Sequence, residues 1–315
     1  MNRKTRILVP VLLFVLFFSV FYTHNESKPS KVVFIDEELT SQEIVNKLYE
    51  EGFIQNKLSY WMLSLNAKFN NTYALGGFEL QEGMGALALH ARLIDPVYKY
   101  VYIEEGLRTE EIAKEVGELL SWDDEKVDRF SKIFPFCSLI GSEGYLHPGK
   151  YAIHKDEGVN VIKNEMNAEL YSYIEEVSGK DNPSEVNKIV TIASLIQREA
   201  GGKNDMRLIS GIIWNRLEQG MPLQLDATLQ YVKGDEELWW PRVHPKDKYL
   251  ESPYNTYQNK GLPPTAIANP GKSAVAAALS PIDTSCLFYL HDARRNIHCS
   301  ATYDGHKQNI DYYLR

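Results

Sequence analysis

The residue best placed to do chemistry is Glu199, an acid at the end of an apolar helical stretch. It follows Ile192 by seven residues, Leu195 by four and Ile196 by three. At 3.6 residues per turn, these side chains share one side of a helix. A carboxylate on an apolar face is costly unless it is paired or used, and burial should raise its pKa. A carboxyl group that stays protonated near neutral pH suits general-acid catalysis, such as glycosidic cleavage.

The stretch that carries Glu199 contains signals for the start and the end of a helix. Asn182 can act as the N-terminal cap, Pro183 suits the first helical position, and Glu185 completes a capping box. Two glycines, Gly201 and Gly202, can end the helix. Apolar residues occupy most sides between these ends, so the sequence predicts a helix at the centre of a domain.

A structural role for Glu199 is the alternative to catalysis. Its carboxylate could pair with Arg198 or Arg216 and take no part in a reaction. Spacing alone favours this structural role, because ion-pair networks also perturb the pKa of a carboxyl group.

Four further segments change that balance. They are GYLHPGKY (144–151), IASLIQREAG (192–201), GIIWNRLEQGMPLQLDATLQYV (211–232) and SPYNTYQNKGLPPTAIANPGKSAVAAALSP (252–281). Together, and in this order, they resemble the MltG/YceG-like endolytic murein transglycosylases. The catalytic acid/base of that family is a Glu at the end of an ASIxxxE helix, and the matching residues here run from Ala193 to Glu199. Gln197 departs from relatives that often carry an acid there, and His147 and Gly149 depart from the usual GYLFPDTY.

The resemblance implies a lyase reaction on peptidoglycan. Glu199 would protonate the leaving oxygen of the MurNAc–GlcNAc β-1,4 bond and then take a proton from the MurNAc 6-hydroxyl, giving a 1,6-anhydro end. No metal or organic cofactor is needed. The family also implies trimming of nascent glycan strands beside peptidoglycan synthases.

Two other functions stay open at this point. One is a two-carboxylate glycoside hydrolase that uses Glu199 with Asp226, the only nearby candidate for a second acid. The other is a non-catalytic scaffold that binds glycan in the cell envelope, for which Glu199 would be dispensable.

Several polar residues are candidates for substrate binding. Asn215 and Arg216 lie on a following helix, where Arg216 could hold a carboxylate of the peptide stem or pair with Glu218. Aromatic and amide side chains that could hold sugars, or belong to a well-packed loop, follow at Tyr254, Asn255, Thr256 and Tyr257. They lie in Lys233–Lys260, which we expect to be a long loop.

The stretch from 223 to 228 alternates apolar and polar residues. Gln224, Asp226 and Thr228 are the polar members. A period of two predicts a strand with these side chains on one face, which could line a sugar cleft or meet solvent.

One pattern occurs three times in the N-terminal half, at Val32–Leu48, Gly77–Leu93 and Tyr100–Val116. Each copy alternates, turns at an acidic residue and continues with helical spacing, which predicts a strand followed by a helix. Thr40 and Thr109 are candidate helix caps. The resemblance makes residues 32–120 a LysM-like module, which could bind glycan or only position the enzyme. The remainder, 121–315, is predicted to be a mixed α+β catalytic domain.

The N-terminus predicts a single membrane anchor. No charge occurs in Ile7–Tyr22, basic residues precede it, and the small residues of a signal-peptidase site are missing. We expect a cytoplasmic tail at 1–6, a transmembrane anchor at 7–23, a stalk at 24–31, and a catalytic domain on the extracytoplasmic side of the cell membrane. The net charge of −8 argues against a nucleic-acid partner.

The chain has three cysteines, Cys137, Cys286 and Cys299. Their spacing fits no zinc pattern, and no metal site is predicted. Cys286 and Cys299 could pair in an oxidising compartment or stay as buried thiols, and the sequence leaves both open.

Overall fold

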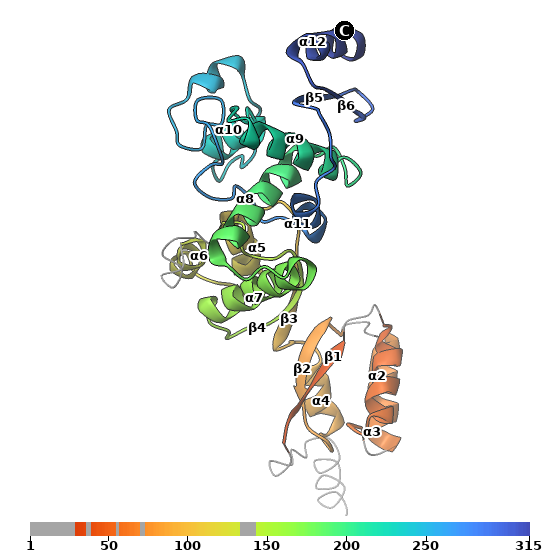
Figure 1. Cartoon of the computed structure of the whole chain (residues 1–315). Coiled ribbons are helices and arrows are strands. Elements are labelled where there is room, and N and C mark those ends of the chain that lie inside the picture. Colours follow the sequence, from red (N-terminus) through yellow and green to blue (C-terminus); the bar gives the residue numbers. More distant parts are fainter. Residues whose placement is uncertain (1–28, 36–38, 55–56, 70–72, 133–142) are drawn as a thin grey trace, which may run out of the picture. The chain divides into compact units, whose positions relative to one another are not determined.

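The computed structural model describes residues 29–315 except 36–38, 55–56, 70–72 and 133–142 (Figure 1). The predicted tail at 1–6, the anchor at 7–23 and most of the stalk at 24–31 therefore lie outside the described residues. Within the described ranges, no helix has the length and apolarity needed to cross a membrane.

The chain divides into two compact units. The first consists of the chain up to Val101 together with Tyr151–Glu157, and the second of Tyr102–Lys150 and Gly158–Arg315. The first boundary between the two units thus falls after Val101, within β3 (Tyr98–Ile103). Strand β4 (Gly149–His154) also has residues in both units. The predicted domain limits, 32–120 and 121–315, stay a prediction.

The first unit is built from short strands and helices around a small apolar core. Its elements are β1 (Lys31–Ile35), α2 (Ser41–Glu50), α3 (Lys57–Phe69), β2 (Gly76–Leu80) and α4 (Ala86–Arg92), with part of β3 and β4. The strand order is β1-β2-β3-β4, and β1 and β2 pair antiparallel with Val33 opposite Phe78. Both of these residues are buried, so one sheet face contributes to the core.

The three sequence copies do form a strand followed by a helix. The pairs are β1 with α2, β2 with α4, and β3 with α5 (Thr109–Leu120). Thr40 is confirmed as the cap of α2, since its hydroxyl accepts from the Glu43 N–H while the Glu43 carboxylate accepts from the Thr40 N–H at 2.7 Å. The prediction for Thr109 is wrong by one residue, because Arg108 occupies the cap position and Thr109 begins α5. The likeness to a LysM domain stays a prediction.

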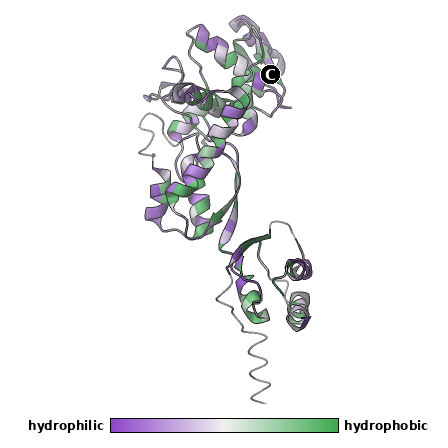
Figure 2. Ribbon diagram, turned by 60° about the horizontal axis from the view of Figure 1, so that its bottom comes forward, coloured by the Kyte–Doolittle hydropathy of each residue, from purple (hydrophilic) through white to green (hydrophobic). Residues whose placement is uncertain are grey.

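The second unit is mainly helical. Its elements are α5, α6 (Asp124–Ser131), α7 (Val159–Ser178), α8 (Pro183–Glu199), α9 (Met206–Glu218), α10 (Asp226–Lys233), the 3₁₀ helix η1 (Pro245–Tyr249), α11 (Lys272–Leu279), β5 (Phe288–His291), β6 (Ile297–Ser300) and α12 (Tyr303–Tyr313). Helix α8 contacts α9, α10 and α11, and its apolar residues form the centre of the core. Figure 2 shows polar and apolar bands on the same helices, as amphipathic packing requires.

Helix α8 has the predicted cap and the predicted limits, but the predicted capping box is wrong, since the Glu185 carboxylate pairs with Lys180. The Asn182 side chain accepts from the Ser184 N–H at 3.0 Å, and Pro183 is the first helical residue. After Glu199 the chain leaves the helix, and the N–H groups of Gly201 and Gly202 donate to the Asp205 carboxylate. Glu199 is therefore fixed at the end of a helix that is buried along most of its length.

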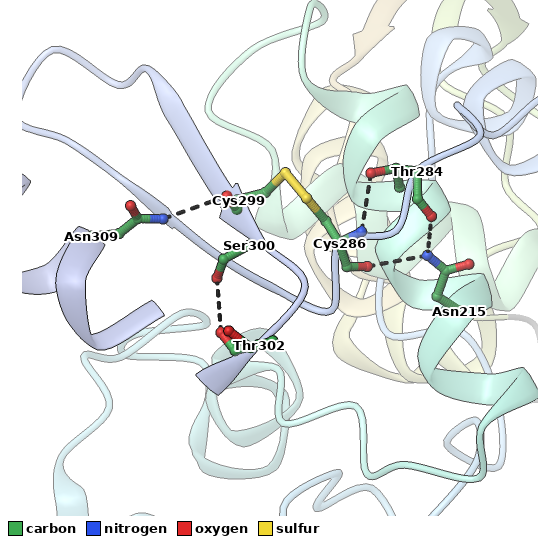
Figure 3. The surroundings of a disulfide bond; sticks show 7 residues. All are labelled: Asn215, Thr284, Cys286, Cys299, Ser300, Thr302 and Asn309. Carbon is green, nitrogen blue, oxygen red and sulfur yellow. Dashed lines mark hydrogen bonds between the residues drawn. A yellow bond between two sulfur atoms is a disulfide. The ribbon is translucent and has the colours of Figure 1, made fainter. Parts of the chain in front are cut away.

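The segment from 286 to 315, here called the C-terminal arm, has almost no core of its own. It consists of the β5–β6 hairpin and α12, and only Cys286 and Leu290 are buried in it. A disulfide joins Cys286 to Cys299 (Figure 3), which decides the pairing that the sequence left open. Cys137 lies outside the described residues.

A buried carboxyl group joins α5 to the loop before α11. Glu143 accepts hydrogen bonds from the Thr109 N–H and from the Asn269 side chain, both at 3.2 Å. Burial raises the pKa of Glu143 to about 8, and the nearby Glu110 adds to this shift. The folded protein therefore keeps Glu143 protonated at neutral pH.

We predict that Glu143→Gln becomes more stable relative to the wild type as the pH rises from about 5 to about 8. The pKa of the folded state is the higher one, so the stabilisation by bound proton is complete at acid pH and is lost as the pH approaches 8. The free energy of unfolding should change by about 1.4 kcal/mol per pH unit within this window. Urea denaturation at three pH values measures it, with the exposed Glu125→Gln as control. A constant difference between variant and wild type across the window would contradict the prediction.

Candidate active site

A cavity of about 740 Å³ opens beside Glu199 in the second unit. Its walls come from α8, α9, α10, the long loop and the C-terminal arm. The lining residues are Glu199, Arg216, Gln224, Asp226, Lys248, Tyr257, Phe288, Tyr289, Tyr303, His306 and Ile310. Aromatic rings and hydrogen-bonding groups face the same space, a combination that suits a carbohydrate.

Both carboxylate oxygens of Glu199 have a partner. Oε1 accepts from the Ala227 N–H at 3.2 Å, and Oε2 accepts from the Tyr289 hydroxyl at 2.8 Å. Burial raises the pKa of Glu199, as the sequence predicts, and Asp226 raises it further, while the two hydrogen bonds and His291 lower it. The cavity leaves the side chain partly exposed, so a ligand can reach a carboxyl group that protein atoms otherwise surround.

The structural alternative for Glu199 required an arginine partner. Arg198 instead lies 3.7 Å from the Trp240 ring centre, and Arg216 donates to the Leu287 carbonyl at 2.7 Å and to the Leu223 carbonyl. Among the residues that the structure describes, neither arginine forms an ion pair with Glu199. Arg216 nevertheless lines the cavity, so its charge faces the same space.

The predicted strand over residues 223–228 is wrong, because α10 begins at Asp226. Residues 223 to 225 precede the helix, and two of them bond to Thr256: the Gln224 N–H donates to its carbonyl and the Leu225 N–H to its hydroxyl. Helical geometry then separates the three polar residues. Gln224 and Asp226 line the cavity, whereas Thr228 is fully buried and donates to the Leu225 carbonyl.

Asp226 is held by a neighbour from the long loop. The Tyr257 hydroxyl donates to its Oδ1 at 2.7 Å, and Lys248 lies 4.7 Å from the Tyr257 ring centre. Asp226 also raises the pKa of Glu199 by its charge, which places the two acids within electrostatic reach.

Four predicted binding residues support the walls and do not line the cavity. Asn215 donates to the carbonyls of Thr284 and Cys286, which anchors the start of the C-terminal arm. The other three belong to the loop after η1. Tyr254 shares a hydrogen bond with Thr265, Asn255 donates to the carbonyls of Lys248 and Leu250, and Thr256 accepts from Leu225. With the buried Thr228, they fix the shape of the site.

Arg108 holds the beginning of the long loop from inside the unit. One of its nitrogens donates to the carbonyls of Gln230, Tyr231 and Trp239, and its guanidinium lies 4.4 Å from the Tyr231 ring centre. Only 4% of this side chain is exposed. A buried cation that contacts carbonyls and aromatic faces ties the end of α10 to the loop that follows it.

Sequence reasoning missed the residues that the C-terminal arm contributes. Tyr289 is the most important, and Phe288, Tyr303, His306 and Ile310 accompany it, with Lys248 from the loop. Phe288 and Tyr289 stand between two leucines, but nothing in the sequence links Tyr289 to Glu199, ninety residues away. Two histidines that the sequence did not single out also have contacts here, since His306 lines the cavity and His291 lies 2.7 Å from Asp205.

Comparisons with known proteins converge on one family. The profile of the YceG-like family matches residues 33–312. An endolytic murein transglycosylase of Bacillus subtilis is 32% identical, covering 77% of this chain and 73% of its own length. One from Streptococcus pneumoniae D39 is 26% identical over 90% of this chain, which spans 58% of that protein. The crystal structure of a YceG-like protein from Listeria monocytogenes has a TM-score of 0.57 at 24% identity, with 89% of this chain and 98% of that chain covered, and it supports the mixed α+β fold.

Proposed function

The chain belongs to the YceG-like family, and on that premise we propose that it is a peptidoglycan lytic transglycosylase with Glu199 as its acid/base. The relatives of this chain carry the name endolytic murein transglycosylase. The observation that carries the proposal is a single protonatable carboxyl group, raised in pKa by burial, at the wall of an open cavity lined by polar and aromatic residues.

The reaction requires one group to act twice. Protonated Glu199 gives its proton to the leaving oxygen as the MurNAc–GlcNAc β-1,4 bond breaks. The resulting carboxylate takes a proton from the MurNAc 6-hydroxyl, whose oxygen then bonds to C1 and closes a 1,6-anhydro ring. Glu199 ends protonated again, and no water is consumed. The raised pKa favours the first step, and the donors at Ala227 and Tyr289 stabilise the carboxylate needed for the second.

Substrate contacts are proposed for the residues that line the cavity. Arg216 can attract the carboxylate of a peptide stem, and Gln224 and Asp226 can hydrogen-bond to sugar hydroxyls. Lys248 of η1 and Tyr257 of the loop after it also line the cavity and add polar groups to its wall. The residues Asn215, Thr228, Tyr254, Asn255 and Thr256 then act through the shape of the walls.

A two-carboxylate hydrolase is the second candidate, because Asp226 shares the cavity with Glu199. Asp226 as a nucleophile would need a free oxygen facing the sugar, and Tyr257 already donates to one of its two oxygens. We favour transglycosylation, and the products distinguish the two reactions: anhydro ends from a transglycosylase, reducing ends from a hydrolase.

We also propose that the enzyme is anchored in the cell membrane through residues 7–23, with the catalytic residues outside, and that it trims nascent strands beside peptidoglycan synthases. The support is the uncharged N-terminal run with its basic flank. We expect the native protein to keep its N-terminal residues, and intact-mass analysis of membrane-extracted protein measures this. A mature N-terminus near Asn25 would contradict the anchor.

We predict that Glu199→Gln lowers turnover on purified glycan strands by about a hundredfold or more. Glutamine keeps the size, and its one amide oxygen can accept from the Ala227 N–H while its NH2 donates to the Tyr289 hydroxyl oxygen, but it cannot give a proton to the leaving oxygen. Mass spectrometry of the products measures both rate and chemistry, and wild-type digests should end in 1,6-anhydroMurNAc. Near wild-type turnover in the variant would remove Glu199 from the mechanism.

We predict that Asp226→Asn weakens activity about tenfold and leaves the anhydro products unchanged. Removing its negative charge also lowers the pKa of Glu199, so the alkaline limb of the pH–rate profile should move to lower pH. The pH dependence of kcat/KM measures the second effect. A glycosyl ester trapped on Asp226, or reducing ends in the wild-type products, would assign the protein to the hydrolases instead.

A further inference from the structure

Tyr289 makes a hydrogen bond to Glu199 that a residue serving only to line the cavity would not need. Its hydroxyl donates to Glu199 Oε2 at 2.8 Å. Burial, followed by the charge of Glu199, keeps the pKa of Tyr289 well above its usual value. Tyr289 therefore stays neutral and remains a donor through the whole pH range in which Glu199 titrates.

A disulfide cross-links the β5–β6 hairpin next to Tyr289. Tyr289 of β5 lies directly opposite Cys299 of β6, and Cys299 is bonded to Cys286, three residues before Tyr289. Figure 3 shows the disulfide between the two chain segments, with Asn215 holding the backbone of Cys286 and Thr284. The cross-link thus fixes the strand partner of the residue that touches the acid.

The rest of the arm contacts the hairpin through aromatic rings, with Tyr313 stacked on His298 and Tyr303 beside Phe288, but it adds no buried core. No residue of α12 is buried, and β6 has no buried residue either. The arm is attached to α9 at its beginning, where Arg216 donates to the Leu287 carbonyl and Asn215 to the Cys286 carbonyl. A segment without a core depends on a cross-link to hold one conformation.

We propose that Tyr289 is a positioning residue for the carboxyl group of Glu199, and that the Cys286–Cys299 disulfide holds the arm so that Tyr289 stays in contact. The catalytic meaning of this contact rests on the proposed function, since it assumes that Glu199 is the acid/base. The hydrogen bond directs Oε2 and favours the carboxylate, while Tyr289 and Phe288 of the arm cover part of the cavity wall and limit the access of water to Glu199.

Several other ionisable groups face Glu199 and set the background for any titration. Asp226 of α10 raises its pKa and His291 of β5 lowers it. Arg216 of α9 and Tyr257 of the long loop also interact with its charge, and His306 of α12 and Lys248 line the same cavity. The substitution of Tyr289 by Phe leaves all of these in place and removes only one hydroxyl.

The first experiment is a titration of the Glu199 carboxyl group in the full-length protein without substrate. Protein labelled with ¹³C at glutamate side-chain carboxyls gives one signal that Glu199→Gln lacks, and its shift with pH reports the pKa of Glu199. In Tyr289→Phe we expect this pKa to rise by about one unit, a tenfold change in proton affinity. Tyr312→Phe is the matched control, because Tyr312 lies on α12, is 80% exposed and does not line the cavity. An unchanged or lowered pKa in Tyr289→Phe overturns the positioning role.

The second experiment reduces the disulfide in a Cys137→Ser background, where only the two paired cysteines remain. A dithiol such as dithiothreitol supplies two electrons and two protons, becomes a cyclic disulfide, and leaves Cys286 and Cys299 as thiols. Water should then reach Glu199, and because burial is the main cause of its raised pKa, that pKa should fall toward its ordinary value. Cys286→Ser/Cys299→Ser should titrate like the reduced protein. A Glu199 pKa that ignores the state of the disulfide overturns this part.

The same samples are assayed on glycan strands, which separates the two proposals. Tyr289→Phe should move the alkaline limb of the kcat/KM profile to higher pH, and reduction should move it to lower pH with about a tenfold lower kcat/KM. If the titrations behave as expected and no anhydro product forms in the wild type, the proposed function fails and the contact stands. If anhydro products form and the titrations do not move, the function stands and the role of Tyr289 fails.

Discussion

The site depends on one constraint, a carboxyl group at the end of a buried helix that forms no ion pair with any arginine or lysine in the described part of the chain. Taking an ion out of water is costly, and an isolated buried carboxylate responds by holding its proton more firmly. The second unit meets this cost with a backbone N–H and a phenol at the two oxygens of Glu199. Two neutral donors stabilise the charge when it forms, yet they leave burial as the dominant influence on its pKa.

The remainder of the site divides into residues that face the cavity and residues that hold those residues in place. Asp226 faces the cavity. Thr256 accepts hydrogen bonds from Gln224 and Leu225, the two residues that precede Asp226, and so determines where α10 begins. Arg108 plays the same part at the other end of α10, where it binds three carbonyl groups of the chain. The loop does not have the regular backbone hydrogen bonds of a helix or a sheet. Buried polar side chains make it rigid instead, so it can hold the residues of a site in place.

The sequence predicted those features that local rules determine. The limits of α8, the strand–helix order of the three copies and the acid on an apolar face all follow from spacing and capping, and the structure confirms them. The start of α10 was misread because an alternation of six residues is too short to distinguish a strand from a turn before a helix. Tyr289 could not be found, since its contact with Glu199 joins residues ninety positions apart. Asn255 shows a different limitation, because residue type alone does not distinguish an amide that could bind sugars from one that donates to carbonyls of its own loop.

The placement of the disulfide has a consequence for the order in which the protein matures. Helix α8 leaves the ribosome long before residues 286–315, and the acid at its end has no phenolic partner until that segment has been synthesised and folded back. The cysteine pair then has to be oxidised before the arm is secured. Newly made chains therefore pass through a stage in which the apolar core around α8 can already be complete while the set of contacts around Glu199 is not. Oxidation of a single pair of thiols marks the end of that latent stage.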